Sequence, residues 1–318
     1  MPIIECVPNF SEGQNPEVIA SIAEAISGVD GVRLLHQDTG FAAHRTVMTF
    51  VGPPSAVVEA AFAGICVATE KIDMRQHHGT HPRFGATDVC PLVPLSEITM
   101  EQVVGWARDL ARRVGENLDY PVFCYEAAAL VEERRNLAFL RAGEYEGLAE
   151  RLQHPNFQPD FGPAAFRPRT GASAIGAREF LLAVNFNLNT ADLRPARRIA
   201  ARVRESGYVR AGKRVPGRCP GTKAIGWYIE DFGIAQVSMN ITRLSQTSLY
   251  QAFRVVSEEA SQLGLRVTGT EIIGLVPSFV IEDTAEALGH DRHEVSAVIE
   301  HLGLDQLQPF IPEKKILP

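Results

Sequence analysis

The sequence predicts an α/β protein of the α+β kind, built from two ferredoxin-like β-α-β-β-α-β subdomains with extra helices. Three observations predict it. The length of 318 residues suits two domains of about 150 residues each. Each half alternates short β-type runs with amphipathic helical stretches. The order of these elements is the same in both halves, and this order defines the split β-α-β-β-α-β motif.

Four β-type runs and two amphipathic helices make up the first half. The first helix is expected to begin at Pro16, because proline suits the first helical position, and Asn15 before it is a good N-cap. The second follows Pro53 and Pro54, and its apolar residues recur at steps of three and four, the spacing of one helix face. The expected strands are 3–7, 32–38, 45–52 and 88–95, and the expected helices are 15–27 and 53–72.

The second half repeats this order of elements. Its two helices each carry an apolar stripe, which begins at Leu193 in one and at Leu249 in the other. Two of its β-type runs are separated by a short turn that contains Gly233, as in a hairpin. The expected strands are 180–188, 223–231, 234–242 and 266–276, and the expected helices are 191–206 and 248–264.

The remaining segments extend the first half. Helices are expected at 100–118 and within 126–153. Residues 153–178 are too rich in proline and glycine for regular structure, and a long segment of this kind between domains is usually functional or a linker. The boundary between the two subdomains is expected after this segment. It gives an N-terminal subdomain of residues 1–180 and a C-terminal subdomain of residues 181–318.

Composition and charge argue against several classes of protein. Hydrophobic residues make up 45% and charged residues 22% of the chain, as in ordinary soluble globular proteins. A net charge of −7 argues against nucleic-acid binding by electrostatics. We expect no signal peptide, and no run approaches the roughly 20 apolar residues of a membrane helix. The five scattered cysteines form no disulfide framework, so a cytoplasmic protein with buried thiols is expected.

Three histidines, His77, His78 and His81, are crowded into one short stretch. The first and third have the i, i+4 spacing of a helical metal pair. Gly79 between them and Pro82 after them disfavour a helix, however, and position 78 is not the glutamate that an HExxH metal site needs. No metal is therefore expected, although a metal-dependent hydrolase that uses this stretch stays open as an alternative.

Acid–base chemistry is a second interpretation of the same stretch. Pro82 restricts the residue before it, and Arg83 adds a permanent cation close to the imidazole of His81. A stiff loop that presents a histidine and an arginine suits proton transfer on an anionic substrate. A solvated surface loop is the alternative.

Several blocks of sequence together resemble the formiminotransferase domain family. The resemblance runs in order from about residue 3 to residue 310. A string of blocks is far more specific than any one motif. The matched length leads us to expect a stand-alone form without a cyclodeaminase domain. The blocks are "ECVPNFSEG", "DTGFAAHRTVMTFVG", "RQHHGTHPRFGATDVCPLVP", "RAGEYEGL", "PDFGPAAF" and "AIGWYIED".

The resemblance implies an activity, a co-substrate and an assembly. It implies transfer of the formimidoyl group from N-formimino-L-glutamate to tetrahydrofolate in histidine degradation, with folate in a groove between the subdomains of a homodimer. Related activities stay open: a glutamate formyltransferase, an ATP-dependent cyclisation of 5-formyltetrahydrofolate, and a folate carrier without catalysis. Nucleic acid and membrane are not expected as partners.

The family's site residues map onto this sequence by their motifs. The catalytic histidine of the family corresponds to His81. Side-chain chemistry, rather than the family motif, suggests that Arg45 or Arg83 holds the carboxylates of the substrate, with a surface ion pair as the alternative. Asp38 is expected to orient the histidine or to bind a substrate ammonium, with stabilisation of its own turn as the alternative. A departure from the animal enzymes stands at Thr80, where they have an acidic residue. A second departure, at Thr170, lies within the expected folate-binding segment. That segment comprises Gly162, Pro163, Ala164, Ala165, Phe166, Arg167, Pro168, Arg169, Thr170 and Gly171.

The charge is distributed unevenly along the chain. Between Arg194 and Lys223 lie ten cations and, among acidic residues, only Glu205. The family resemblance suggests that this excess attracts the polyglutamate tail of a folate. A solvated helix face followed by a mobile loop is the alternative.

Overall fold

The chain folds into two compact units. The computed structural model describes residues 1–41, 43–79 and 81–317. The units are Met1–Glu179 and Phe180–Pro318. Each has its own sheets and its own buried apolar core.

The first unit contains the predicted β-α-β-β-α-β segment. Its first strand is interrupted and is counted as β1 and β2. The strands pair antiparallel in the order β3–β4–β1/β2–β5, which places the fourth strand beside the first, as in a ferredoxin-like sheet. This part of the prediction is confirmed. The elements are β1 (Ile3–Cys6), β2 (Asn9–Phe10), α1 (Pro16–Ser27), β3 (Arg33–Gly40), β4 (Arg45–Gly52), α2 (Pro54–Lys71) and β5 (Thr87–Ser96).

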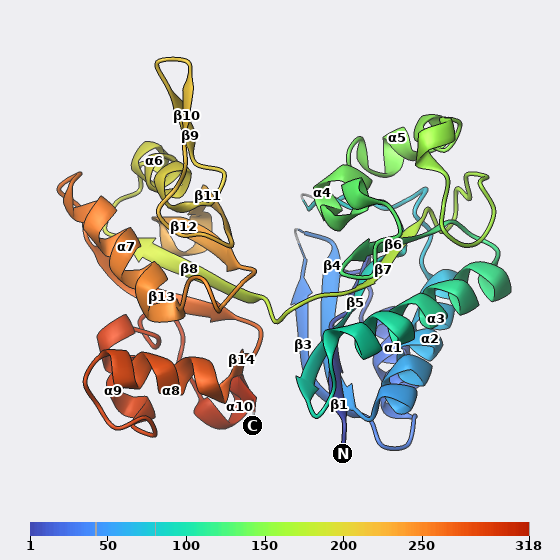
Figure 1. Cartoon of the computed structure of the whole chain (residues 1–318), viewed down its shortest axis with the longest axis horizontal. Helices are drawn as coiled ribbons and strands as arrows, with labels where there is room; N and C mark the ends of the chain where they lie inside the picture. Colours follow the sequence, from blue (N-terminus) through green and yellow to red (C-terminus); the bar gives the residue numbers. More distant parts are fainter. Residues whose placement is uncertain (42, 80, 318) are drawn as a thin grey trace. The chain divides into compact units, whose positions relative to one another are not determined.

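Local chemistry explains where these helices begin and which face they bury. The side chain of Asn15 accepts hydrogen bonds from the backbone N–H groups of Glu17 and Val18, as the N-cap prediction requires. The apolar stripes of α1 and α2 lie against the sheet, where Ile22 and Ile65 are fully buried. With α3 (Met100–Leu118), these helices cover one face of the sheet (Figure 1).

Two parallel strands extend this sheet beyond β5. They are β7 (Ser173–Ala177) and β6 (Val122–Glu126), in the order β5–β7–β6. The prediction that residues 153–178 lack regular structure is therefore wrong at its C-terminal end. At Gly176 a side chain would approach the Tyr125 carbonyl oxygen to 2.3 Å, so the strand consists of small residues that give little β signal.

The predicted helices within residues 126–153 are present but short. A 3₁₀ turn, η1 (Glu132–Arg135), precedes α4 (Leu137–Leu140) and α5 (Glu144–Arg151), and a second, η2 (Pro155–Phe157), follows them. Leu140 and Leu148 from these helices pack with Phe123 of β6 in a small apolar cluster. Because side chains alternate along a strand, this cluster lies on the sheet face opposite to α1, α2 and α3.

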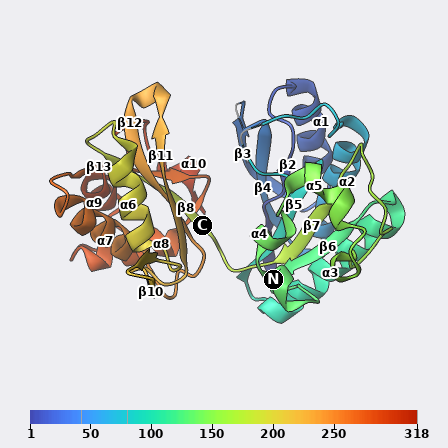
Figure 2. The same ribbon diagram turned by 90° about the horizontal axis from the view of Figure 1, so that it is seen from above.

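The second unit repeats the ferredoxin-like order. Its sheet runs β11–β12–β8–β13, with every pairing antiparallel, and α6 and α7 cover one face (Figure 2). The prediction for this half is confirmed. The elements are β8 (Leu182–Leu188), α6 (Leu193–Val203), β11 (Thr222–Ile229), β12 (Ile234–Ile241), α7 (Leu249–Ser261) and β13 (Val267–Ile273), with η3 (Glu230–Phe232) in the turn between β11 and β12.

Two additions to this unit were not predicted. The basic segment, for which a mobile loop was the alternative, contains a hairpin, β9 (Tyr208–Arg210) and β10 (Lys213–Val215), whose turn places Gly212 at a positive φ. Short elements then follow β13 to the end of the described chain. They are β14 (Val276–Pro277), α8 (Ser278–Ala287), α9 (Val295–Leu302), α10 (Pro312–Lys315) and β15 (Ile316–Leu317).

The thiols agree with the expectation of buried, unpaired cysteines. Cys6, Cys90, Cys124 and Cys219 are buried, Cys66 is half-buried, and all five are free. Within the three described ranges, no helix combines the length and the apolar character needed to span a bilayer.

A close backbone approach at Gly85 gives a stability prediction. A Cβ at this position would lie 1.9 Å from the carbonyl oxygen of Ala172, so Gly85→Ala is expected to destabilise the protein by about 2 kcal/mol or more. Gly105 lies within α3 with nothing near its Cβ position. Gly105→Ala, the control, should stabilise by about 0.5–1 kcal/mol. Urea unfolding measures both, and equal stabilities for the two variants would contradict the prediction.

Candidate active site

The histidine loop is the stretch that contains His77, His78 and His81. The predicted folate-binding segment holds this loop at its base. The N–H of Met74 donates to the Arg169 carbonyl at 2.9 Å, and the N–H of Ala86 donates to the Thr170 carbonyl at 2.8 Å. Gly171 takes a positive φ of 68°, and a Cβ there would lie 2.2 Å from the Phe84 carbonyl oxygen. The structure therefore brings the two segments together, although about 90 residues separate them in the sequence.

The ring of His81 has a defined orientation and tautomer. Its Nδ1 lies 2.7 Å from the carbonyl oxygen of Pro82. Because a carbonyl only accepts, Nδ1 carries the proton and donates, which leaves the lone pair on Nε2. Burial lowers the pKa of His81 to about 4, and the cations Arg45 and Arg141 act in the same direction. At neutral pH the ring is therefore an uncharged base.

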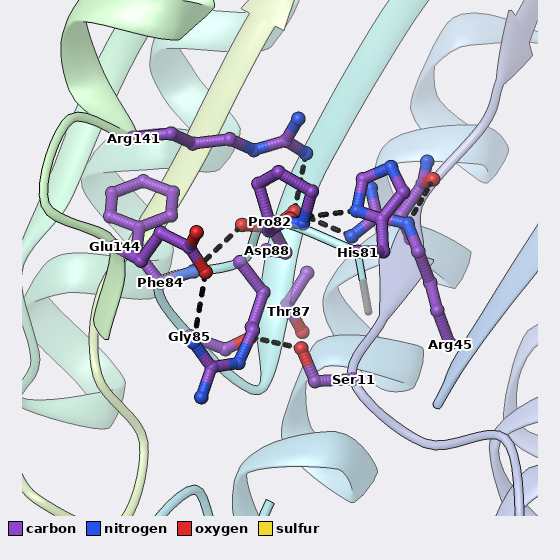
Figure 3. A network of polar contacts seen from close by, with 12 residues as sticks. Ser11, Arg45, His81, Pro82, Phe84, Gly85, Thr87, Asp88, Arg141 and Glu144 are labelled. Atoms are coloured by element: carbon purple, nitrogen blue, oxygen red, sulfur yellow. Dashed lines mark hydrogen bonds and ion pairs between the residues drawn. The ribbon is translucent and has the colours of Figure 1, made fainter. Parts of the chain in front are cut away.

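Two guanidinium groups share one buried carboxylate beside this ring. Arg45 donates from Nη1 to Asp88 at 2.6 Å, and Arg141 donates to the same carboxylate oxygen (Figure 3). A third donor is the N–H of Phe84, at 3.0 Å from the other oxygen. Burial would raise the pKa of the fully buried Asp88, but Arg141 and Arg45 hold it below its usual value.

His77 supports the loop from inside. Its Nε2 lies 2.7 Å from the carbonyl of His44, and its Nδ1 lies 3.3 Å from the Nε of Arg83, which can only donate. The two histidine rings stack with centroids 4.2 Å apart. These contacts favour a structural role for His77. The exposed His78 lines a small cavity of about 440 Å³ with Arg83 and Glu146.

Arg83 is engaged by other protein groups. Besides His77, it donates to Glu144 at 3.0 Å and to Glu146 at 2.7 Å, while its side chain is buried. These contacts favour a structural role, and the predicted contact of Arg83 with substrate stays a prediction. Asp38 is exposed on β3, and among the described residues no hydrogen bond or ion pair joins it to His81. Thr80 lies outside the described residues.

The predicted folate-binding segment, Gly162–Gly171, is irregular and partly exposed. Arg167 donates to the backbone carbonyl of Asp119 at 2.8 Å and pairs with its carboxylate, and Arg169 donates to the Glu70 carbonyl. Thr170 is buried, and no residue in the described part of the chain hydrogen-bonds its hydroxyl. A buried hydroxyl of this kind can form a hydrogen bond with a ligand or with a water molecule.

Asp88 and Arg141 were not assigned a role on the sequence. Each lies in a block that carries the family resemblance, but only the fold shows that β5 and the end of α4 bring them to one place. Among the described residues, no group of three or more histidine, cysteine, aspartate or glutamate side chains could hold a metal ion.

The pKa of His81 gives a prediction for stability against pH. The group titrates at 6.5 when unperturbed and at about 4 in the folded protein, so between these values the unfolded chain binds the extra proton. Stability should therefore fall as the pH decreases through this window, and His77, whose pKa is also lowered, adds in the same direction.

Urea unfolding at about pH 7 and about pH 5 measures this loss. His81→Gln should lose less stability than the parent between the two pH values. His154→Gln, which changes an exposed histidine in the same unit, should lose as much as the parent. An equal loss in His81→Gln and in the parent would show that the pKa of His81 is not lowered.

Comparison with known proteins follows the division of the fold. Residues 3–178 match the model described as "Formiminotransferase domain, N-terminal subdomain", and residues 183–318 match "Formiminotransferase domain". Among solved structures, a microcompartment protein from Desulfitobacterium hafniense covers 86% of this chain and is itself covered to 94%, at 10% identity and a TM-score of 0.24, too low to carry an argument.

Curated relatives match across both units. Formimidoyltransferase-cyclodeaminase of Sus scrofa is 44% identical over 99% of this chain, which spans 59% of that relative's length. Glutamate formimidoyltransferases of Streptococcus pyogenes and Thermoplasma acidophilum are each 42% identical, over 89% and 90% of this chain and 92% of their own lengths. With both family models and these relatives matched, the chain belongs to the formiminotransferase domain family.

Proposed function

We infer that this protein transfers the formimidoyl group from N-formimino-L-glutamate to tetrahydrofolate and releases L-glutamate. The relatives that share 42% identity over most of their length bear the name of this activity. The observation that carries the inference is the uncharged His81, with its Nε2 lone pair beside two guanidinium groups. A base placed next to cations suits a reaction in which an anionic amino acid receives or loses a proton.

One residue can serve both proton transfers of the reaction. As N5 of the folate attacks the amidine carbon, a new N–C bond forms and N5 loses a proton to Nε2 of His81. The imidazolium then returns this proton to the amine of glutamate while the old C–N bond breaks. The low pKa of His81 makes its protonated form a strong acid, which favours this second transfer.

Two other groups have proposed binding roles. Arg45 faces the histidine and has the planar geometry that binds a carboxylate, so it is assigned to the amino-acid substrate. The Gly162–Gly171 segment is assigned to the folate, because it forms the base of the histidine loop and contains the hydroxyl of Thr170, which no described residue hydrogen-bonds. We also propose a cytoplasmic homodimer of this chain.

The basic hairpin β9–β10 is assigned to the polyglutamate tail of the folate. Other cations of the basic segment are engaged: Arg202 and Arg218 pair with Glu259. Arg210 and Lys213 are exposed on the hairpin. Attraction of this kind weakens with salt. Equal affinity for monoglutamyl and polyglutamyl folates, at low and high salt alike, would contradict it.

The function is tested with three alternative reactions: tetrahydrofolate with N-formimino-L-glutamate, tetrahydrofolate with N-formyl-L-glutamate, and 5-formyltetrahydrofolate with ATP. N-formimino-L-glutamate should give 5-formimidoyltetrahydrofolate, whereas N-formyl-L-glutamate should give little product. 5-Formyltetrahydrofolate with ATP should give no cyclised product. Turnover of either formyl compound at the higher rate would favour the formyl alternatives. Loss of hydrolysis of the donor on treatment with a chelator would favour the metal-dependent hydrolase.

A further inference from the structure

The cluster of Arg45, Asp88 and Arg141 has more positive than negative charge. Among the described residues, the salt bridges to both guanidinium groups come from Asp88 alone. Two cations and one carboxylate leave a net charge of +1. Asp88 is fully buried, and the side chains of Arg45 and Arg141 are only 8% and 16% exposed. A net charge that is shielded from water in this way costs free energy unless an anion binds to it.

The two guanidinium groups are held where an anion could meet both. Figure 3 shows them reaching one carboxylate from two sides, with the ring of His81 next to them. Arg45 is fixed further by Asn9, which accepts from its Nε at 2.9 Å. The Nε of Arg141 is buried, and no acceptor in the described part of the chain pairs with it. Arg141 therefore has a donor for which the described residues provide no acceptor.

We propose that Arg45 and Arg141 together form a subsite for the α-carboxylate of the amino-acid donor. Asp88 is the positioning residue that sets the two guanidinium groups side by side. The proposal deepens the proposed function and rests on it, because it names the part of the donor that this cluster recognises.

Chemistry selects the α-carboxylate over the other carboxylate of the donor. The reacting nitrogen and the α-carboxylate are attached to the same carbon atom. A base that serves this nitrogen therefore lies next to any group that binds the α-carboxylate. The guanidinium groups that adjoin His81 meet this requirement, and guanidinium binds carboxylate through paired N–H donors.

The proposal also explains why two cations lie close to a histidine that must accept a proton. Without substrate, the two cations act against protonation of the ring, as burial does. A carboxylate bound between them offsets part of their charge, so the ring becomes more basic when the donor is present. The base is then activated by the substrate that it serves.

The test compares two donors in parent and variant proteins. N-formimino-4-aminobutyrate has the same chain as N-formimino-L-glutamate but lacks the α-carboxylate. The parent should prefer the complete donor, in kcat/KM, by about 100-fold. Arg141→Gln should reduce this preference by about 30-fold or more, mainly through KM of the complete donor. Arg141→Lys keeps a cation but loses the paired N–H donors of the guanidinium group. Its preference for the complete donor should lie between those of the parent and of Arg141→Gln.

Controls separate this subsite from a structural role and from the folate. Arg135, a short distance before Arg141 in the chain, is an exposed arginine that pairs with Glu132. Arg135→Gln should keep the full preference for the complete donor. The KM for tetrahydrofolate should change less than about threefold in Arg141→Gln. An equal loss with both donors, an unchanged preference, or an increase confined to the KM of tetrahydrofolate would each overturn the proposal; the last would assign the cluster to the folate's glutamate tail.

A binding measurement keeps this result distinct from failure of the proposed function. In an NMR titration of His81, L-glutamate should raise the ring pKa of the parent, whereas 4-aminobutyrate should not. Arg141→Gln should start from a higher pKa and show little further response to L-glutamate. This readout needs no turnover. A parent that transfers no formimidoyl group but still responds to L-glutamate refutes the proposed function and leaves the subsite standing. No response to L-glutamate in the parent would overturn the subsite.

Discussion

Replacing His81 by alanine is expected to lower kcat by about 10²-fold or more, because the variant loses the group that takes a proton from the folate nitrogen and returns it to the leaving amine. KM should change little, since the ring contributes mainly to the transition state. Steady-state kinetics at neutral pH, with a circular dichroism spectrum to check the fold, measures the effect.

An exposed histidine of the same unit provides the matched control. His154 lies just before η2 and is exposed, so His154→Ala should retain activity within about twofold. Near-normal turnover in His81→Ala would remove this residue from the mechanism. Equal losses in both variants would point to a general effect on the fold.

Replacing Asp88 by asparagine is expected to lower the free energy of unfolding by about 3 kcal/mol. The carboxylate accepts from Arg45, Arg141 and a backbone N–H, and the variant leaves two guanidinium groups in a buried site without a countercharge. Asp109→Asn, which breaks an exposed pair with Arg112, should change stability by less than about 0.5 kcal/mol. Urea unfolding measures both.

A double variant distinguishes lost charge balance from lost shape. If the uncompensated charge is the cause, Asp88→Asn combined with Arg141→Gln should recover part of the stability that Asp88→Asn loses. A double variant with the sum of the two single losses would contradict this explanation. A loss below about 1 kcal/mol in Asp88→Asn alone would contradict the prediction itself.

Most of the fold could be predicted because periodicity and caps report local structure. Asn15 and Pro16 mark the beginning of α1 in the sequence and do so in the structure. The repeated order of elements predicted both ferredoxin-like sheets. Strand β7 was missed because its small residues are set by close contact with β6, which is a tertiary requirement without a local signal. The basic hairpin was missed because its strands have three residues each.

The candidate site could be predicted only where its residues are neighbours in sequence. Crowded histidines and a following proline and arginine led to His81. Its relation to Arg141 depends on a contact between β5 and the end of α4, 53 residues apart. In the fold, Arg83 forms salt bridges with Glu144 and Glu146. No local sequence pattern indicates these pairs. Charge pairing across the fold therefore decides which arginine adjoins the base.

The most direct test of the account follows the one-carbon group itself. N-formimino-L-glutamate labelled with ¹³C at the formimidoyl carbon is mixed with tetrahydrofolate and the parent protein, and the label is observed by NMR. We predict that the signal moves from glutamate to N5 of the folate, and that His81→Ala slows this movement by about 10²-fold or more. A label that stays on glutamate, or that appears as free formamide or formate, would contradict the account.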